Sequence, residues 1–309
     1  MLALVTGSRG FVGPWLRDHL AAAGDTVVEL DRALGSPDIV DRDATLAFIA
    51  EHSPDVVYHL AGLSHVPRSF DDPISTLQVN VLGTQNVLDG ARLAGAQRAL
   101  VVTSAAVYGA VDPAHQPIAE TQPFAPTSPY AASKAAADVM AQQAWLSHGF
   151  EAIRARPFNH IGPGQTANFV AAGLAERIVA AERSGADAIA VGNLTARRDF
   201  TDVRDVVRAY RGLITDGRPG EAYNICTGVD VAIQELAERL LAMADIPLTL
   251  EIDPELVRSI DTSRVRGDAS KIRSDTGWNP TIDLETTLRD LLDEKRGAST
   301  SGPPADSKG

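Results

Sequence analysis

The first half of the chain alternates short apolar runs with segments whose apolar residues recur at helical spacing. Strands are predicted at Ala3–Thr6, Thr26–Leu30, Asp55–Leu60, Ala99–Ser104 and Glu151–Arg156. Helices are predicted at Phe11–Ala23, Ala44–His52, Thr76–Leu93 and from Pro129 onward. This alternation is typical of βαβ units, so we predict an α/β fold built on a doubly wound parallel (Rossmann) sheet. A further strand could fall within Ala33–Ile39, but Gly35 and Pro37 indicate that it is short or missing.

After Arg156 the pattern loosens, and loops rich in glycine, proline and asparagine separate the apolar segments. Helices are predicted there at Ala167–Ser184, Val203–Thr215, Ile233–Ala244 and Leu284–Arg296. We therefore predict a Rossmann domain at 1–156 and a smaller α/β substrate domain at 157–296, with an interleaved boundary because the two share a sheet. The small polar residues of 297–309 predict a mobile tail.

Composition narrows the class of protein. The 309 residues are 44% hydrophobic and 22% charged, as in ordinary globular proteins. A net charge of −12 disfavours a nucleic-acid partner. The sequence shows no basic leader followed by a long apolar stretch, so we expect a cytoplasmic protein with no membrane partner. Cys226 is the single cysteine and is expected in the core, and the histidines lack ligand spacing, so no metal site is predicted.

A tyrosine and a lysine lie near the start of the alanine-rich helix. Ser128 is a suitable N-cap and Pro129 suits the first helical position. Tyr130 and Lys134 are four positions apart, so they share a helix face. An ammonium beside a phenol lowers the phenol's pKa, which would give a proton donor and acceptor for alcohol and ketone chemistry. The same spacing is common on ordinary surface helices, so other groups must decide.

A glycine-rich loop follows the first strand and opens the first helix. Its glycines are Gly7, Gly10 and Gly13, with Phe11 and Val12 between them. Glycines permit a tight turn and a close approach to a pyrophosphate, and the helix N-terminus supplies N–H donors and partial positive charge. The loop therefore predicts a dinucleotide cofactor.

Asp31 stands at the end of the second strand, where a carboxylate would accept hydrogen bonds from the adenosine ribose. It would also repel a 2′-phosphate, which favours NAD(H). Arg9 and Arg32 leave NADP(H) possible, because either could pair with that phosphate.

Ser104 is predicted at the carboxyl end of its strand, facing the ligand crevice. Its hydroxyl could donate a hydrogen bond to a substrate carbonyl or alkoxide. On its own Ser104 would equally suit a plain strand-end cap.

The order and spacing of these groups resemble the extended short-chain dehydrogenase/reductases that act on nucleotide sugars. The matching motifs also include His59–Gly62, Asn80–Asn86 and Arg198–Val203, with coverage from the first strand to about Arg296. Within that family, Arg156–Gln165 resembles the GDP-sugar branch.

The resemblance implies roles for individual residues. Ser104, Tyr130 and Lys134 would form the catalytic triad. Tyr130 would exchange a proton with the sugar C4 oxygen while the nicotinamide exchanges hydride with C4, and Lys134 would also hold the nicotinamide ribose. The implied cofactor contacts are Gly7, Gly10, Phe11, Val12, Gly13, Asp31, Arg32, Asp38, Ile39, Leu60, Ala61, Gly62, Tyr130, Lys134 and Pro157. The implied substrate contacts are Ser104, Asn159, Arg198 and Arg258, with Arg264 and Arg266 as substitutes for Arg258.

One departure from the family narrows the chemistry. Family dehydratases carry an acidic pair directly after the serine, where this chain has Ala105 and Ala106. Alanine has no acid or base, so a 4,6-dehydratase is disfavoured. Two activities remain: reduction of the C4 ketone of a GDP-4-keto-6-deoxy-hexose, and NAD-dependent 4-epimerisation of a nucleotide sugar. Asp31 and Thr103–Gly109 resemble the epimerases.

A non-catalytic, cofactor-binding regulator is less favoured, because Tyr130 and Lys134 are both present. The resemblance also implies a homodimer, formed through the helices that contain Asn80–Leu93 and Tyr130–Trp145.

Overall fold

The computed structural model of the chain describes residues 1–256 and 263–297. Arg258 and the tail beyond Gly297 lie outside the described residues. Within the described part, no helix has the length and apolar character needed to cross a membrane.

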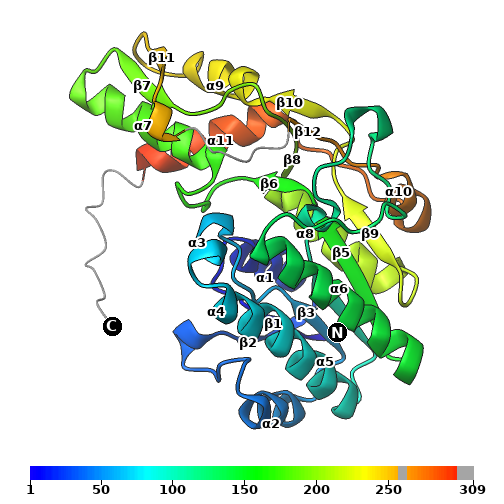
Figure 1. Cartoon of the computed structure of the whole chain (residues 1–309). Coiled ribbons are helices and arrows are strands. Elements are labelled where there is room, and N and C mark those ends of the chain that lie inside the picture. Colours follow the sequence, from blue (N-terminus) through cyan, green and yellow to red (C-terminus); the bar gives the residue numbers. More distant parts are fainter. Residues whose placement is uncertain (257–262, 298–309) are drawn as a thin grey trace.

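A six-stranded parallel sheet forms the centre of the larger part of the molecule (Figure 1). Its order is β2 (Thr26–Leu30), β1 (Leu2–Thr6), β3 (Val56–His59), β4 (Arg98–Val102), β5 (Glu151–Pro157) and β9 (Ala222–Ile225). The strand β2 pairs with one edge of β1, and β3 pairs with the other edge. The strand order therefore reverses at β1, and a crevice opens at the carboxyl ends of β1 and β3. The predicted doubly wound fold is confirmed.

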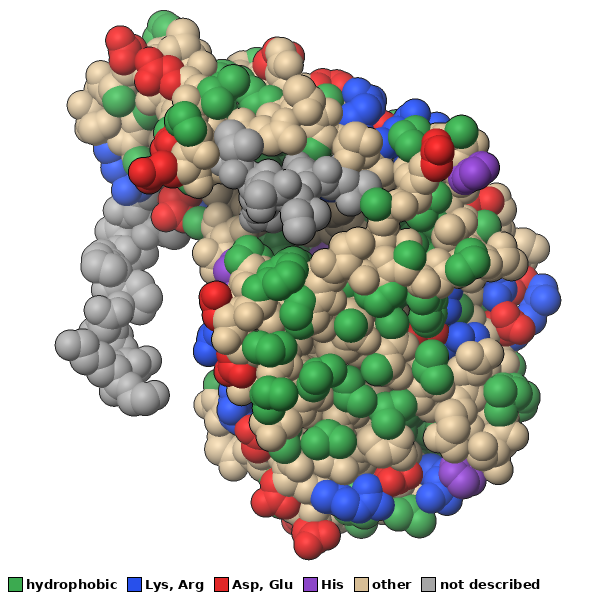
Figure 2. Space-filling model, in the orientation of Figure 1, with side chains coloured by type: hydrophobic (Ala, Val, Ile, Leu, Met, Phe, Trp, Pro, Cys, Tyr) green, Lys and Arg blue, Asp and Glu red, His purple; other side chains and the backbone are tan. Residues whose placement is uncertain are grey.

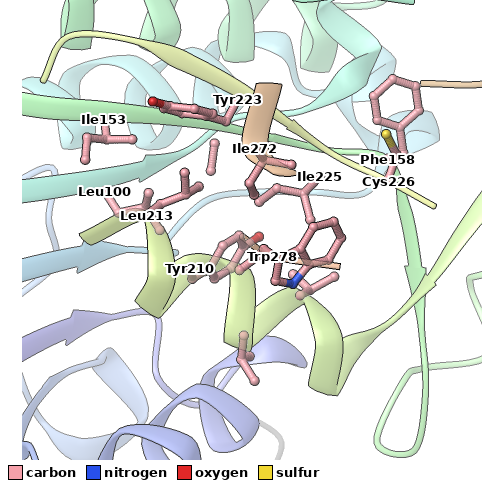
Figure 3. Close-up of a cluster of buried hydrophobic side chains, with 14 of the residues drawn as sticks. Leu100, Ile153, Phe158, Tyr210, Leu213, Tyr223, Ile225, Cys226, Ile272 and Trp278 are labelled. Atoms are coloured by element: carbon pink, nitrogen blue, oxygen red, sulfur yellow. The ribbon is translucent and has the colours of Figure 1, made fainter. Parts of the chain in front are cut away.

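Helices cover both faces of this sheet. One face carries α1 (Val12–Ala22), α8 (Val203–Asp216) and α10 (Ser270–Thr276), whose apolar side chains pack in one cluster with Tyr223 and Cys226 (Figure 3). The other face carries α2 (Arg42–His52), α5 (Gly83–Leu93) and α6 (Pro129–His148). Cys226 is fully buried, as predicted, and burial raises the pKa of its thiol.

Two short helices, α3 (Val66–Asp71) and α4 (Pro73–Leu77), precede a π-helical turn, η2 (Gln78–Leu82). The sequence predicted one continuous helix over Thr76–Leu93, so this turn corrects the prediction. The wide turn coincides with Asn80, whose buried side chain hydrogen-bonds both backbone groups of Leu63.

The segment Ala33–Ile39 contains no strand, as its Gly35 and Pro37 indicated. A short 3₁₀ turn, η1 (Arg32–Leu34), replaces it, and the Asp31 carboxylate caps this turn by accepting from the Ala33 N–H.

The remaining elements build a smaller part. Its strands are β6 (Asn159–Ile161), β7 (Ala188–Val191), β8 (Arg197–Asp202), β10 (Asp230–Ala232), β11 (Thr249–Ile252) and β12 (Arg264–Val265). Its helices are α7 (Val170–Ser184), α9 (Ile233–Leu241) and α11 (Leu284–Gly297), which share a second core. The chain also contains the 3₁₀ turns η3 (Ala105–Tyr108), η4 (Pro113–His115) and η5 (Pro254–Leu256), of which η3 packs in the core of the larger part.

The two parts are interleaved in sequence, because β9, α8 and α10 follow Arg156 yet pack in the larger part. Figure 1 shows β6 and β8 between the larger part and the layer of α7, α9 and α11. A boundary at residues 156/157 therefore stays a prediction.

Candidate active site

The start of α6 positions Tyr130. The Ser128 hydroxyl accepts from the Ala131 N–H at 3.1 Å and Pro129 occupies the first turn, so the predicted cap is confirmed. The Tyr130 N–H, free of a helical partner at this position, donates to the Ser69 hydroxyl of α3 at 3.1 Å.

Ser104 meets Tyr130 from the end of β4. It lies two residues beyond the strand and begins η3, where its hydroxyl accepts from the Ala106 N–H at 3.1 Å. The same hydroxyl hydrogen-bonds the Tyr130 phenol, favouring the ionised phenol and so acting as the donor. The structure thus brings together two of the three predicted catalytic groups by direct contact.

Lys134 lies one turn further along the same face of α6. Its side chain is 7% exposed, and its ammonium donates to the Val102 carbonyl at 2.9 Å. Burial lowers the pKa of Lys134 to about 8.

The pKa of Tyr130 differs from the sequence-based expectation. Burial raises the pKa of the phenol, and the Ser104 hydrogen bond lowers it only in part. The predicted lowering by Lys134 is wrong for this structure: burial and the Ser104 hydrogen bond determine the shift, and the Lys134 ammonium binds the Val102 carbonyl. Tyr130 is consequently held in its protonated, proton-donating form at neutral pH.

The glycine loop lies against the segment that follows β3. Gly7 has φ +69°, and a Cβ there would come within 2.7 Å of the Ala61 backbone. At Gly13 a Cβ would lie 2.2 Å from the Ser8 carbonyl oxygen. Phe11 provides no side-chain cap for α1, and the Gly13 N–H donates to the Gly10 carbonyl at 3.2 Å. This cradle suits a dinucleotide pyrophosphate.

Asp31 lies beside the glycine loop, as predicted. Its carboxylate accepts from the Arg9 N–H at 2.9 Å and from the Ala33 N–H at 2.9 Å. Arg32 pairs with Asp38 at 3.0 Å on the surface. Ile39, predicted beside the adenine, is 5% exposed and belongs to the core below α5.

A buried polar chain that sequence reasoning missed holds the segment Leu60–Gly62. The Ala61 N–H donates to the Thr6 hydroxyl at 3.1 Å, and that hydroxyl lies 2.7 Å from His59 Nδ1. His59 Nε2 lies 3.0 Å from the Thr84 hydroxyl, which donates to the Asn80 carbonyl at 2.7 Å.

These contacts fix the protonation of His59. Thr84 uses its proton on Asn80, so it accepts from His59 Nε2–H, and Nδ1 accepts from Thr6. The ring is therefore neutral. Burial lowers its pKa to about 3, with a contribution from the positive charge of Lys134. A histidine that ends an otherwise apolar strand is the sequence signal that could have indicated this chain.

Asn80 ties the same segment to α6. Its amide donates to the Leu63 carbonyl at 3.0 Å and to the Ser133 hydroxyl at 2.9 Å, next to Lys134. A Cβ on Gly62 would come within 3.1 Å of Lys134 Nζ, so the segment and the lysine are close neighbours.

The predicted substrate residues lie on neighbouring strands. Asn159, which is exposed, lies opposite Phe200 in the β6–β8 pair, and Pro157, which was predicted as a cofactor contact, ends β5 just before it. Arg198 precedes Phe200 by two positions, so strand periodicity places it on the face that Asn159 shares. Arg264 and Arg266 instead face Asp230, at 2.6 and 3.9 Å.

The fold and these groups define an extended short-chain dehydrogenase/reductase. A protein-family model described as GDP-mannose 4,6 dehydratase matches residues 33–291. The chain belongs to this family.

Individual relatives span nearly the whole chain. It is 40% identical to a GDP-6-deoxy-D-mannose reductase from Pseudomonas aeruginosa, over 94% of this chain and 95% of the relative. It is 33% identical to a UDP-glucose 4-epimerase from Mycolicibacterium smegmatis, over 97% of this chain and 100% of the relative.

Solved structures agree. RMD from Pseudomonas aeruginosa complexed with NADPH superimposes with a TM-score of 0.88 at 38% identity, covering 96% of this chain and 99% of that one. The UDP-glucose 4-epimerase of Thermus thermophilus in complex with NAD gives a TM-score of 0.86 at 28% identity, covering 96% of this chain and 100% of that one. The predicted enzyme family is confirmed.

Proposed function

We propose that this enzyme reduces the C4 ketone of a GDP-linked 4-keto-6-deoxy-hexose, with Tyr130 as the proton donor. The observation that carries this proposal is the hydrogen bond between Ser104 and a protonated, half-buried Tyr130, one helical turn from Lys134. The similarity to a GDP-6-deoxy-D-mannose reductase supports the choice of reaction.

The chain's own residues supply the proton chemistry. A bound reduced nicotinamide supplies the hydride that goes to C4. When the ketone binds, Ser104 would redirect its hydroxyl proton from the Tyr130 phenol to the ketone oxygen and so orient it, and Tyr130 would give that oxygen its phenolic proton, so the ketone becomes an alcohol. Lys134, one turn further along the same face of α6, would hold the nicotinamide ribose.

Elimination of water is not supported, despite the description of the family model. Ala105 and Ala106 follow Ser104 in η3, and neither carries a group that could remove a proton from C5 or protonate the leaving hydroxyl. The groups of the site are suited to hydride exchange at the sugar C4 and proton exchange at its oxygen, without elimination.

A 4-epimerase is the second candidate, favoured by the similarity to UDP-glucose 4-epimerases. It would use the same Ser104, Tyr130 and Lys134 but would retain its cofactor through each turnover. The two candidates differ in net cofactor consumption.

NAD(H) is the cofactor that we propose as preferred. The Asp31 carboxylate stands where the adenosine ribose would lie, and its charge disfavours a 2′-phosphate. Arg9 and Arg32 are each paired with an acid, Glu29 at 3.5 Å and Asp38 at 3.0 Å, which reduces their attraction for that phosphate.

The nucleotide diphosphate is proposed to lie along β6 and β8. Asn159 and Arg198 share a face there, and an arginine fork suits a diphosphate. Arg258, outside the described residues, is proposed as the second arginine. The Arg156–Gln165 segment supports guanosine as the nucleoside.

We also propose that a second copy of the chain covers α6. The only charged residues of this helix, Lys134 and Asp138, are both buried, so its exposed face carries none. The exposed large apolar residues include Val139 and Leu146 of α6, and Leu82 and Leu93 of the neighbouring η2 and α5. Figure 2 shows apolar side chains gathered on the face of the molecule that carries these elements. An uncharged apolar face lets two acidic chains approach without repulsion.

A single screen tests the reaction. GDP-, UDP- and dTDP-linked 4-ketosugars are supplied with NADH or NADPH, and cofactor oxidation is followed at a fixed enzyme concentration. Stoichiometric oxidation with a GDP-4-keto-6-deoxy-hexose is expected. Isomerisation of an intact nucleotide hexose without net oxidation would replace the reductase by the epimerase.

A further inference from the structure

Val102, which ends β4, and the two residues that follow it each contact a different turn of α6. Ser104 hydrogen-bonds Tyr130, and Val102 accepts from Lys134 at 2.9 Å. The residue between them, Thr103, donates to Asp138 at 3.3 Å. Tyr130, Lys134 and Asp138 are spaced by four, so they form one stripe along α6. The third contact has no part in the reaction described above.

Asp138 is also held by the next strand of the sheet. Arg156 binds it through two nitrogens, Nε to Oδ2 at 2.7 Å and Nη2 to Oδ1 at 2.9 Å. Arg154 adds a contact to Oδ1 at 2.9 Å. The single proton of the Thr103 hydroxyl is shared between Asp138 Oδ2 at 3.3 Å and the Ala155 carbonyl at 2.9 Å. Each carboxylate oxygen of Asp138 thus has two donor groups within hydrogen-bond distance, one of them shared with β5.

The cluster is removed from solvent. Asp138 is 0%, Arg156 3% and Arg154 8% exposed. A buried carboxylate is tolerated only with such compensation, and charge pairs in this setting are strong and geometrically demanding. The cluster is therefore a rigid joint, and its members come from α6, from β5 and from the residue that follows β4.

Those three elements carry the working groups of the site. The helix α6 carries Tyr130 and Lys134, the end of β4 leads to Ser104, and β5 leads through Arg156 to Pro157 and Asn159. The Asp138 carboxylate thus joins α6, β5 and the segment after β4, two helical turns along α6 from Tyr130.

We propose that Asp138 is a positioning residue, which acts through Thr103 and Arg156 to set the register of Ser104 against Tyr130. The inference rests on the proposed oxidoreductase chemistry for its kinetic test only. It concerns geometry that the reductase and the epimerase would share.

Substitutions at Thr103 test the joint with little disturbance. Thr103→Val removes the hydroxyl, and Thr103→Ser keeps it as the matched control. Thr103→Val is expected to lower kcat about tenfold or more with KM and cofactor affinity within about twofold, because a small misplacement of reacting groups affects the chemical step most. Thr103→Ser is expected to restore kcat.

A double-mutant cycle shows whether Thr103 acts through Ser104. In a Ser104→Ala background, Thr103→Val is expected to lower kcat less than about twofold, because no Ser104 hydroxyl remains to be positioned against Tyr130. An undiminished loss in that background, a wild-type kcat for Thr103→Val, or an equal defect in Thr103→Ser would each overturn the proposal.

The assay uses whichever nucleotide sugar the wild type converts, so absence of wild-type turnover rejects the proposed function alone. Urea unfolding of Thr103→Val, Asp138→Asn and the double variant needs no substrate. A shift in the midpoint of the double variant that is smaller than the sum of the single shifts is expected. Additive shifts would show that Thr103 and Asp138 are not coupled and would overturn the joint.

Discussion

At the scale of single residues, the site is a contact between one hydroxyl and one phenol that lie far apart in sequence. Ser104 meets Tyr130 because β4 ends two residues before it and α6 starts just after Ser128. The raised pKa of Tyr130 keeps its proton available for donation.

Tyr130→Phe is expected to lower kcat by about 10²- to 10⁴-fold, because the general acid is lost. Cofactor affinity should stay within about threefold, since the glycine loop and Asp31 are untouched. Steady-state kinetics and cofactor titration measure both. Tyr58→Phe is the matched control: its buried hydroxyl has no hydrogen-bond partner, so kcat should be unchanged. Wild-type turnover by the Tyr130 variant would remove it from the mechanism.

Asp31→Ala is expected to move the ratio of kcat/KM for NADH over NADPH toward NADPH by about tenfold, because one charge repulsion near the 2′-phosphate disappears. Asp31→Asn serves as the control for capping, since an amide oxygen can still accept from the Arg9 and Ala33 N–H groups. Both variants should shift the ratio. An unaltered ratio in both would contradict the proposed role of the carboxylate.

At the scale of elements, apolar periodicity predicted most helices and strands, because a parallel sheet covered by helices imposes two regular spacings. It predicted a continuous helix over Thr76–Leu93, where the structure has a π turn. The cause is tertiary: Asn80 turns inward to bind Leu63 and Ser133, which lie elsewhere in the sequence.

The candidate site was predictable to the same extent. Gly7, Asp31, Ser104 and Tyr130 lie at element ends, where local sequence and topology together assign a place. The partners of Asp138 and His59 could not be predicted, because a sequence shows that charged and polar groups exist and leaves their pairing to the folded packing.

The approach of the glycine loop to the β3 end gives a prediction with an internal control. Gly7→Ala and Gly24→Ala both place a side chain at positive φ, +69° and +82°. The added Cβ meets the Ala61 backbone at Gly7 and nothing within 4 Å at Gly24. Backbone strain should lower the free energy of unfolding of each variant by about 1 kcal/mol. The contact with Ala61 should lower it further in Gly7→Ala, which should also bind the cofactor more weakly. Equal effects on cofactor affinity would argue against the close approach.

The His59 chain predicts a loss of stability in acid. The folded pKa of about 3 lies below the ordinary 6.5, so the unfolded chain binds the extra proton first as the pH falls. The contribution of His59 to the free energy of unfolding is fully present above pH 6.5 and is lost progressively as the pH falls toward 3. Between about pH 7 and pH 5 the decline is about 2 kcal/mol. Urea unfolding of His59→Gln over that range should show a decline smaller by about that amount, and parallel curves would refute the assignment.

At the scale of the whole molecule, two parts interleaved in sequence carry the glycine loop and the β6–β8 pair that we propose for the nucleotide diphosphate. The chain carries a net charge of −12, but the exposed face of α6 carries no Lys, Arg, Asp or Glu side chain. That face is where Figure 2 shows apolar side chains gathered.

Light scattering after size exclusion should give a particle of about twice 32.7 kDa. Leu146→Glu introduces a charge at a side chain that is 72% exposed, and its self-repulsion across the contact should produce the single-chain mass. Ile252→Glu, at a 69% exposed residue of β11, should leave the assembly intact. A wild-type chain that is already a monomer would refute the proposed contact.

The return of β9 to the first sheet has a consequence for biosynthesis. During translation, residues 1–156 leave the ribosome long before Ala222–Ile225, so β5 waits as an unpaired edge, and α8 is not yet there to cover the apolar side chains below it. The nascent first half is then an aggregation-prone intermediate, because its missing contacts are with residues far later in the sequence. A fragment that stops at residue 156 should accordingly aggregate when expressed alone, and co-expression of the remaining residues should rescue its solubility.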